Sequence, residues 1–168
     1  IPDHCCAEKN YINLNGYWDY RIVKDKSRRL PDSYEGKILV PFSPESPLSG
    51  VNRALQPNET LWYHRTFDNP LLSGQRLLLH FGAVDQMCAV YVNGRRAVCH
   101  RGGFLPFSVD ITRYLRSGKN ELVVKVRDVS DRGWHSRGKQ KTRMEECFIP
   151  LRVEYGRQSG WKQYLEVI

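Results

Sequence analysis

A thiol, an imidazole and a guanidinium follow one another at Cys99, His100 and Arg101. A thiol and an imidazole can hold a metal ion, or form a nucleophile and its base, when both side chains reach one point. The surrounding residues alternate between apolar and polar, which is typical of a β-strand. Neighbouring side chains of a strand point to opposite faces of the sheet. Cys99 and His100 are therefore not expected to act together, either on a metal ion or in catalysis.

The residues after this pair are interpreted as structural. Gly102 and Gly103 allow the chain to bend or bulge at the end of a strand. Phe104 and Phe107 are then predicted to enter the hydrophobic core on either side of Pro106.

Carboxylate pairs are the other candidates for catalysis, because two neighbouring carboxyl groups can act as general acid and general base when their pKa values differ. Glu145 and Glu146 are adjacent, but they lie in a charged, glycine-poor segment in which the sequence indicates no apolar wall that would raise the pKa of one of them. They are interpreted as a solvated patch, and no catalytic residue is assigned.

The chain contains five cysteines, an odd number, and no Cys-x-x-Cys pair that would indicate a zinc site. A disulfide between Cys88 and Cys99 is conceivable, since a hairpin separates them. Reduced thiols are favoured, because a free cysteine in a half-buried sheet usually behaves as a small apolar residue.

Short β-rich segments separated by glycine and proline account for most of the chain, which predicts a β-sandwich or barrel. Asn93 and Gly94 lie between two alternating segments and predict a tight type I′ hairpin turn. Residues 41–60 are predicted to form an ordered surface loop. Residues 110–120 are predicted to form either a short helical turn, with Asp110 as its cap and Gly118 at its end, or an ordered loop. The expected strands are residues 17–23, 37–42, 61–69, 75–82, 87–94, 95–102, 121–129, 147–155 and 161–168.

Charge and hydropathy limit the partners of this chain of 168 residues, whose formal net charge is +8. Its basic clusters carry no helix-turn-helix, zinc-finger or RNP signature, so nucleic acid is not expected as a partner. No run of about 18 apolar residues indicates a membrane span. The opening residues lack the features of a signal peptide. The cytoplasm is favoured because reduced thiols are expected. A periplasmic or secreted protein whose signal peptide was removed stays open.

Five motifs follow one another in a fixed order between residues 81 and 126. They are F-x-G/A-V-D at 81–85, V-x-V-N-G at 90–94, H-x-G-G-F-x-P-F at 100–107, Asp-Ile-Thr at 110–112 and G-x-N-x-L-x-V-x-V at 118–126. In this order they resemble the N-terminal sugar-binding domain of glycoside hydrolase family 2, which includes β-galactosidases, β-glucuronidases and β-mannosidases. Residues 14–22, 61–67, 136–140 and 158–160 extend the resemblance over nearly the whole chain.

The resemblance implies an all-β fold, a jelly-roll β-sandwich of the galactose-binding type, as a single domain over residues 1–168. In the family an immunoglobulin-like domain and a TIM barrel follow, and the barrel supplies both catalytic carboxylates. The chain is therefore expected to be the non-catalytic N-terminal fragment of a longer glycosidase, without metal or cofactor. Its expected partners are a β-glycoside carbohydrate and those remaining domains. The alternative is a stand-alone, lectin-like carbohydrate-binding module.

Two segments are expected to contact carbohydrate. Some family members place an Asp six residues before the Gly of the closing Ser-Gly motif, which here is Gly160, and use it to bind a substrate hydroxyl. Glu154 occupies that position, with a side chain longer by one methylene. It could equally be an exposed residue of a strand.

The second segment is the loop that contains Trp134, Arg137, Lys139 and Gln140. An exposed Trp can stack on a sugar ring, and Arg and Lys can pair with the carboxylate of a uronic acid. The same loop could instead pack against the barrel.

Overall fold

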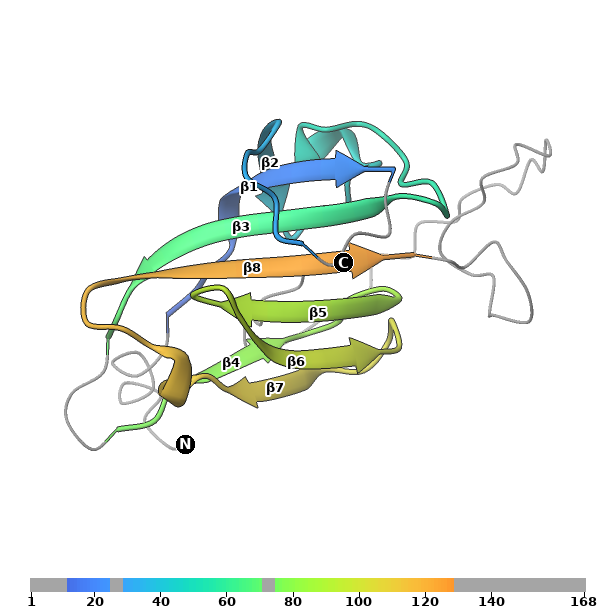
Figure 1. Ribbon diagram of the computed structural model, residues 1–168. Coiled ribbons are helices and arrows are strands. Elements are labelled where there is room, and N and C mark those ends of the chain that lie inside the picture. Colours follow the sequence, from blue (N-terminus) through green and yellow to red (C-terminus); the bar gives the residue numbers. More distant parts are fainter. Residues whose placement is uncertain (1–11, 25–28, 71–74, 129–168) are drawn as a thin grey trace, which may run out of the picture.

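The computed structural model describes residues 12–24, 29–70 and 75–128. These residues form eight β-strands and two short 3-10 helices (Figure 1). The strands are β1 (Gly16–Val23), β2 (Gly36–Val40), β3 (Thr60–Asp68), β4 (Leu78–Phe81), β5 (Met87–Val92), β6 (Arg95–Arg101), β7 (Phe107–Asp110) and β8 (Lys119–Arg127). The 3-10 helices are η3 (Pro47–Ser49) and η4 (Thr112–Tyr114). No helix within the described ranges is long and apolar enough to cross a membrane.

The strands form two sheets, and every pair of neighbours is antiparallel. One sheet has six strands in the order β2-β1-β3-β8-β5-β6, and the other consists of β4 and β7. Buried side chains from both sheets form one hydrophobic cluster, in which Leu79 and Phe81 of β4 join residues of β1, β3, β5 and β8. The predicted all-β sandwich is confirmed.

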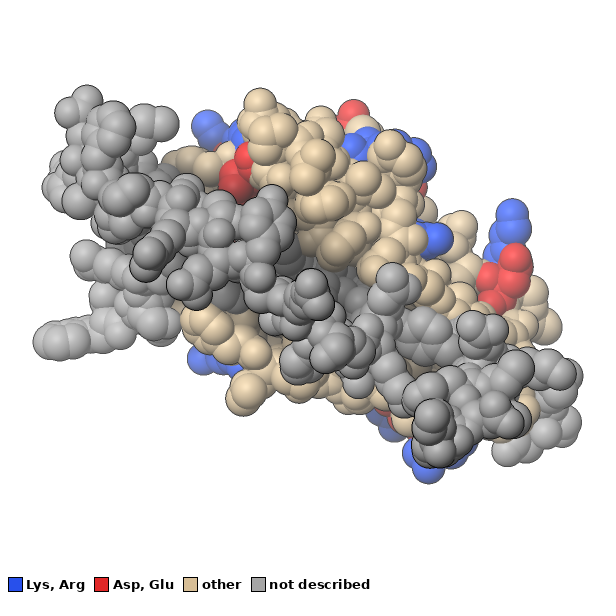
Figure 2. Space-filling view, turned by 180° about the vertical axis from the view of Figure 1, so that it is seen from behind, with Lys and Arg blue, Asp and Glu red and all other residues tan. Residues whose placement is uncertain are grey.

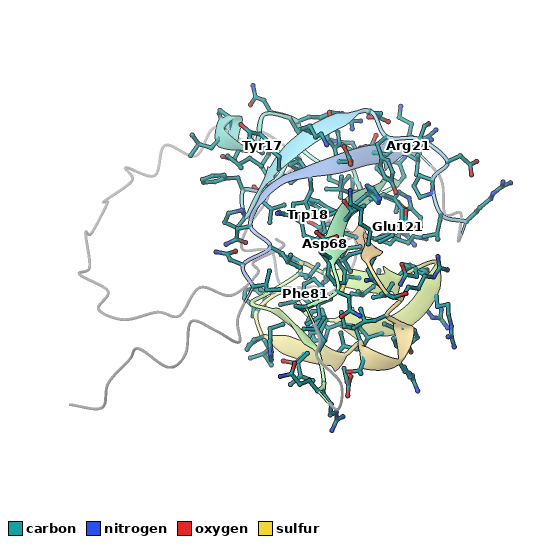
Figure 3. The ribbon with its side chains drawn as sticks, turned by 90° about the vertical axis from the view of Figure 1, so that its left-hand side faces the viewer. Tyr17, Trp18, Arg21, Asp68, Phe81 and Glu121 are labelled. Carbon is teal, nitrogen blue, oxygen red and sulfur yellow. The ribbon has the colours of Figure 1, made fainter. Side chains whose placement is uncertain are left out.

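The core follows from the alternation of side chains along each strand. On β1, Trp18 lies between the sheets, whereas Tyr17 and Arg21 lie on the opposite face of the strand (Figure 3). The rings of Trp18 and Tyr63 meet edge to face at 6.4 Å between centroids. Trp18 Nε1 also donates a hydrogen bond of 2.8 Å to the carbonyl of Leu14, so the buried indole is fully paired.

Trp62 is also buried, with 1% of its surface exposed, but unlike Trp18 it points to the outer face of the six-stranded sheet. There its ring lies 6.2 Å from that of Tyr91 and 5.0 Å from Lys125 Nζ. The next residue, Tyr63, faces the core, because successive side chains of β3 alternate between the two faces.

The hairpin has the predicted geometry, and a short helical turn, η4, forms where one was predicted, but its N-cap residue is Ile111 and not Asp110. Asn93 and Gly94 both adopt positive φ, 51° and 78°, as a type I′ turn requires. Asp110 Oδ1 accepts a hydrogen bond of 3.0 Å from the backbone N–H of Thr112 at the start of η4. Gly118, which ends this region, has a φ of 83°.

The segment around Cys99 is structural, as predicted, but one of its residues is not where it was expected. Cys99 is exposed, whereas the ring of His100 lies on the inner side and stacks on Phe107 at 4.1 Å. Phe107 also stacks on Phe81 at 4.7 Å, so its predicted place against the core is confirmed. Phe104 is 64% exposed, so its predicted burial is wrong. It lies in the turn between β6 and β7. This turn extends past the ends of the strands, so the two sheets do not cover its side chains.

Cys88 and Cys99 are free thiols, as favoured from the sequence. Cys88 pairs with His100 across the β5–β6 hairpin, and Cys99 pairs with Ala89. The two cysteines therefore point to opposite faces of the sheet, which prevents a disulfide.

On the face shown in Figure 2, the charged side chains of the described residues lie mainly near the edge. Figure 2 shows the Lys and Arg side chains on one face as separate small groups near its edge. The described part of that face carries no single basic patch of the kind that follows a nucleic-acid backbone.

Candidate functional site

Several strand ends and loops meet at one end of the sandwich, on the right-hand side of Figure 1. The strand register places the start of β3 beside the end of β8, since Leu61 pairs with Val126. The start of β5 lies between the ends of β8 and β6, because Met87 pairs with both Arg127 and Arg101. We call this the pocket end of the domain.

The loop of residues 41–59, between β2 and β3, contributes one wall of the pocket end. The Ser46 side chain accepts a hydrogen bond from the N–H of Leu48 and so caps η3. The buried Ser49 hydroxyl donates to the carbonyls of Ser46 and Pro44, at 2.7 and 3.3 Å, and accepts from the N–H of Val51 at 3.0 Å. These local bonds confirm the predicted ordered loop.

A buried carboxylate anchors the far side of the same loop. Glu59, which is 1% exposed, accepts 2.5 Å and 3.0 Å hydrogen bonds from Arg53 Nη2 and from the N–H of Gln56. The next residue, Thr60, begins β3. These hydrogen bonds therefore join the end of the loop to earlier residues of the same loop, immediately before β3 enters the core.

The opposite wall combines the segment after β4 with the turn after β6. Gly103 is buried so close to Asp85 that a Cβ atom on it would lie 2.2 Å from Asp85 Oδ1. The N–H of Gly102 donates to the carbonyl of Gln86 at 2.8 Å, and the N–H of Gln86 approaches the carbonyl of Arg127 at 3.4 Å. These contacts join both segments to the end of β8.

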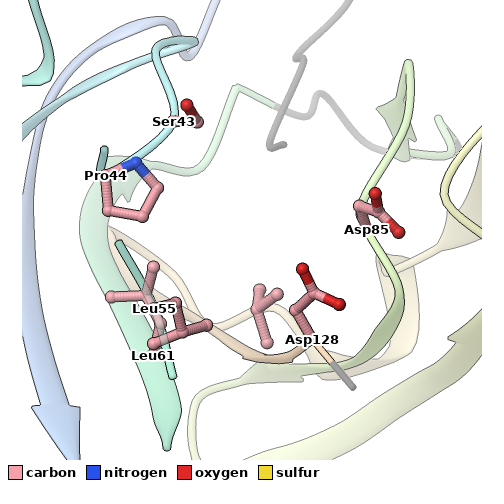
Figure 4. A pocket seen from close by; sticks show the side chains of 7 residues that line it. Ser43, Pro44, Leu55, Leu61, Asp85 and Asp128 are labelled. Carbon is pink, nitrogen blue, oxygen red and sulfur yellow. The ribbon is translucent and has the colours of Figure 1, made fainter. Parts of the chain in front are cut away.

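Between these walls lies a small pocket with about 300 Å³ of empty space, part of it open to solvent (Figure 4). Its residues are Ser43, Pro44, Leu55, Leu61, Asp85, Val126 and Asp128. The aliphatic side chains form its floor, and Asp85 and Asp128 lie across the pocket from Ser43 and Pro44 (Figure 4).

The chemistry of this pocket suits a polyhydroxylated molecule. Carboxylates and a hydroxyl accept hydrogen bonds from hydroxyl groups, and aliphatic side chains pack against C–H groups. The enclosed part of this space is only about 20 Å³, room for about one water molecule, so these residues form a shallow depression and not a complete ligand pocket.

The side chains predicted to contact carbohydrate, Trp134, Arg137, Lys139, Gln140 and Glu154, lie outside the described residues. Asp128, on the pocket rim, is the last described residue before them. Their assignment stays a prediction.

Asp85 and Asp128 were not identified as site residues from the sequence. One signal was available, because each follows the end of a strand: β4 ends at Phe81 and β8 at Arg127. Their approach to Ser43 depends on the course of loop 41–59, which strand periodicity does not reveal.

Comparison with known proteins gives a consistent result. Residues 45–140 match the family described as “Glycosyl hydrolases family 2, sugar binding domain”. The chain is 38% identical over 124 residues to the β-glucuronidase of Paenibacillus borealis, covering 70% of this chain and 21% of that protein. It is 36% identical over 66 residues to the β-galactosidase of Thermoanaerobacter pseudethanolicus, covering 39% of this chain and 9% of that protein.

Solved structures include a similar fold in a related enzyme. The Bifidobacterium dentium β-glucuronidase, complexed with coumarin-3-O-glucuronide, superposes with a TM-score of 0.54 at 33% identity. The match covers 67% of this chain and 19% of that one. The chain thus spans about a fifth or less of the length of the proteins named here.

Proposed function

Since the chain belongs to glycosyl hydrolase family 2 and holds that family's sugar-binding domain, a jelly roll of the galactose-binding type, we propose that it is the non-catalytic N-terminal part of a retaining β-glucuronidase or β-galactosidase. The observation that carries the proposal is the match over residues 45–140, in a chain that spans 21% of a β-glucuronidase relative. In this proposal, the catalytic carboxylates belong to a barrel domain elsewhere in the parent protein.

The pocket end is the surface proposed to form one wall of the substrate pocket. It has hydrogen-bond acceptors in Asp85, Asp128 and Ser43, and an ordered loop over residues 41–59. A wall that is rigid before substrate arrives places its acceptors without an additional ordering cost. Arg137 and Lys139 remain the proposed partners of a uronate carboxylate. Trp134, Gln140 and Glu154 remain proposed sugar contacts.

The same end is also proposed to contact the other domains of the parent enzyme. Phe104 and Leu105, in the turn after β6, are 64% and 71% exposed. Two adjacent large apolar side chains at this exposure favour a surface that another domain covers. The basic excess of the chain, +8, would then face an acidic surface.

The first experiment is to read the source gene past the codon for Ile168 and to express the full protein that it encodes. Leu105→Asn in that protein is expected to lower kcat/KM for a nitrophenyl β-glycoside by about tenfold or more, because misplacing a pocket wall disturbs substrate geometry. Leu78→Asn is the matched control, since Leu78 is also exposed but lies at the far end of β4 from this turn. The control should change activity by less than about twofold.

Three results would contradict the proposal. One is hydrolysis of nitrophenyl glycosides by the 168-residue chain after repeated purification. Another is equal activity of the two variants in the full protein. A third is saturable binding of glucuronate, galactose or mannose by the 168-residue chain together with a stop codon soon after Ile168, which would establish the lectin-like alternative.

A further inference from the structure

His64 of β3 lies on the outer face of the six-stranded sheet, between two carboxylates from the neighbouring strands. Its Nδ1 is 3.0 Å from Asp19 Oδ2 of β1, and its Nε2 is 3.2 Å from Glu121 Oε1 of β8. The His64 side chain is 16% exposed, so water replaces these contacts only in part. One imidazole thus bridges the strands on both sides of its own.

The protonation state of the ring decides how many of these contacts are hydrogen bonds. A neutral imidazole has one N–H donor, and its other nitrogen presents a lone pair. In that state one carboxylate faces a lone pair and is repelled. A protonated ring donates from both nitrogens, and both contacts become charge-assisted hydrogen bonds. The other neutral tautomer only exchanges the N–H and the lone pair between the two nitrogens and does not remove the conflict.

The surroundings hold the ring in this position. The ring of Tyr34, from the segment before β2, stacks on that of His64 at 4.6 Å with an interplanar angle of 18°. Burial, followed by the charges of Glu121 and Asp19, raises the pKa of Tyr34 to about 12, so its hydroxyl stays neutral. Among the described residues, no group of three or more His, Cys, Asp or Glu side chains is arranged to hold a metal ion.

The charges around the ring come from three strands. Lys37 of β2 pairs with Asp19 at 2.6 Å, whereas Glu121 of β8 is the more exposed carboxylate. Burial alone would raise the pKa of Asp19, but the hydrogen bonds from Lys37 and His64 outweigh it and the pKa is lowered. Two other cations of this face are engaged elsewhere, Arg21 with Ser33 and Lys125 with Trp62.

We propose that His64 is a proton-controlled clamp, which joins β1 and β8 across β3 when it is protonated and releases one carboxylate when it is neutral. Imidazole is the group that ordinarily changes charge between about pH 5 and 8, where carboxylates stay ionised. A histidine that gains anionic partners on folding stabilises the fold while it is protonated. That contribution is lost as the pH rises and the ring loses its proton. The folded domain is therefore expected to be more stable in mildly acidic solution than at higher pH.

The test compares the 168-residue chain with His64→Gln, which keeps one donor and one acceptor but cannot carry charge. Between about pH 8 and pH 5.5, the melting temperature of the parent chain should gain about 2–4 °C relative to the variant. His80→Gln is the matched control, because His80 of β4 bonds to an uncharged partner, Ser108 Oγ, at 2.6 Å. This control should follow the parent chain at both pH values.

A second measurement keeps the proposal testable if His64→Gln does not fold. In the ¹⁵N-labelled parent chain, both ring nitrogens of His64 should carry protons in mildly acidic solution, because each then donates to one of the two carboxylates. Asp19→Asn should reduce the pH-dependent gain in melting temperature. Parallel melting curves of parent and His64→Gln, or a ring nitrogen of His64 that stays unprotonated at about pH 5.5, would overturn the proposal.

Discussion

Replacing Gly103 by alanine would place a methyl group against the Asp85 side chain. The new Cβ would lie 2.2 Å from Asp85 Oδ1, 2.4 Å from its Cγ and 2.9 Å from its Cβ. Carbon atoms in folded proteins do not approach so closely, so either the turn after β6 or the segment after β4 must move. Gly103 is buried, and the Asp85 Cβ is attached directly to the backbone. A rotation of one flexible side chain therefore does not relieve the whole clash.

We expect Gly103→Ala to lower the free energy of unfolding by about 2–3 kcal/mol, the upper part of the range for overpacking. For a chain of this length, that corresponds to a fall in melting temperature of about 4–12 °C. Urea unfolding followed by tryptophan fluorescence provides the assay, because Trp18 and Trp62 are both buried in the folded state.

A double-mutant cycle isolates the cause of this destabilisation. Asp85→Ala removes the Oδ1 and Cγ atoms that the new methyl group would meet, so Gly103→Ala should cost at least about 1 kcal/mol less in that background. Gly118→Ala is the control. Its Cβ would meet nothing within 4 Å, but its φ of 83° makes the substitution cost about 1 kcal/mol in either background.

Two results would refute this reasoning. Gly103→Ala could unfold within about 0.5 kcal/mol of the parent chain, which would mean that the turn adjusts freely. The cost could also be the same with and without the Asp85 carboxylate, which would mean that the clash is not its source.

Two further predictions concern titratable groups. Hydrogen bonds from Thr112, followed by Arg76, lower the pKa of Asp110 to about 2. The stability that Asp110 contributes is complete above its unfolded value of 3.8 and is lost as the pH falls through about 2. The melting-temperature deficit of Asp110→Asn should therefore shrink over this range in thermal scans, and a constant deficit would contradict the assignment. Burial raises the pKa of Cys88 to about 12, whereas Cys99 is exposed. An aromatic disulfide reagent at about pH 8 should label Cys99 in the folded chain and Cys88 only after unfolding, as peptide mass analysis can show. Equal labelling rates would contradict this.

Features that depend on neighbours in the chain were predictable. Asn93 and Gly94 form the expected turn because a type I′ turn depends on the φ angles of those two residues. Cys99 and His100 face opposite sides because any strand separates adjacent side chains in this way. The direction of side chains also alternates along β3 because of strand geometry alone. The hydrogen bond from the N–H of Thr112 to Asp110 joins residues only two positions apart in the chain.

Features that depend on strand order were not predictable by the same reasoning. Asp19 and His64 meet although 45 residues separate them, because β1 and β3 are neighbours in the sheet. Asp85 approaches Gly103 because the segment after β4 and the turn after β6 reach the same end of the sandwich. The pocket also needs loop 41–59 to return across that end, bringing Ser43 to it.

The amino-acid sequence by itself thus determined the all-β class, the hairpin and the family to which the chain belongs. Each of these depends on the order and spacing of residues along the chain. Only the tertiary structure decided that Phe104 is exposed, that Trp62 faces outward from the sandwich and that His64 lies between two carboxylates. Local alternation tells which side chains share a face of a strand. The strand order and the ends of the sheets decide what covers that face and which charges meet on it.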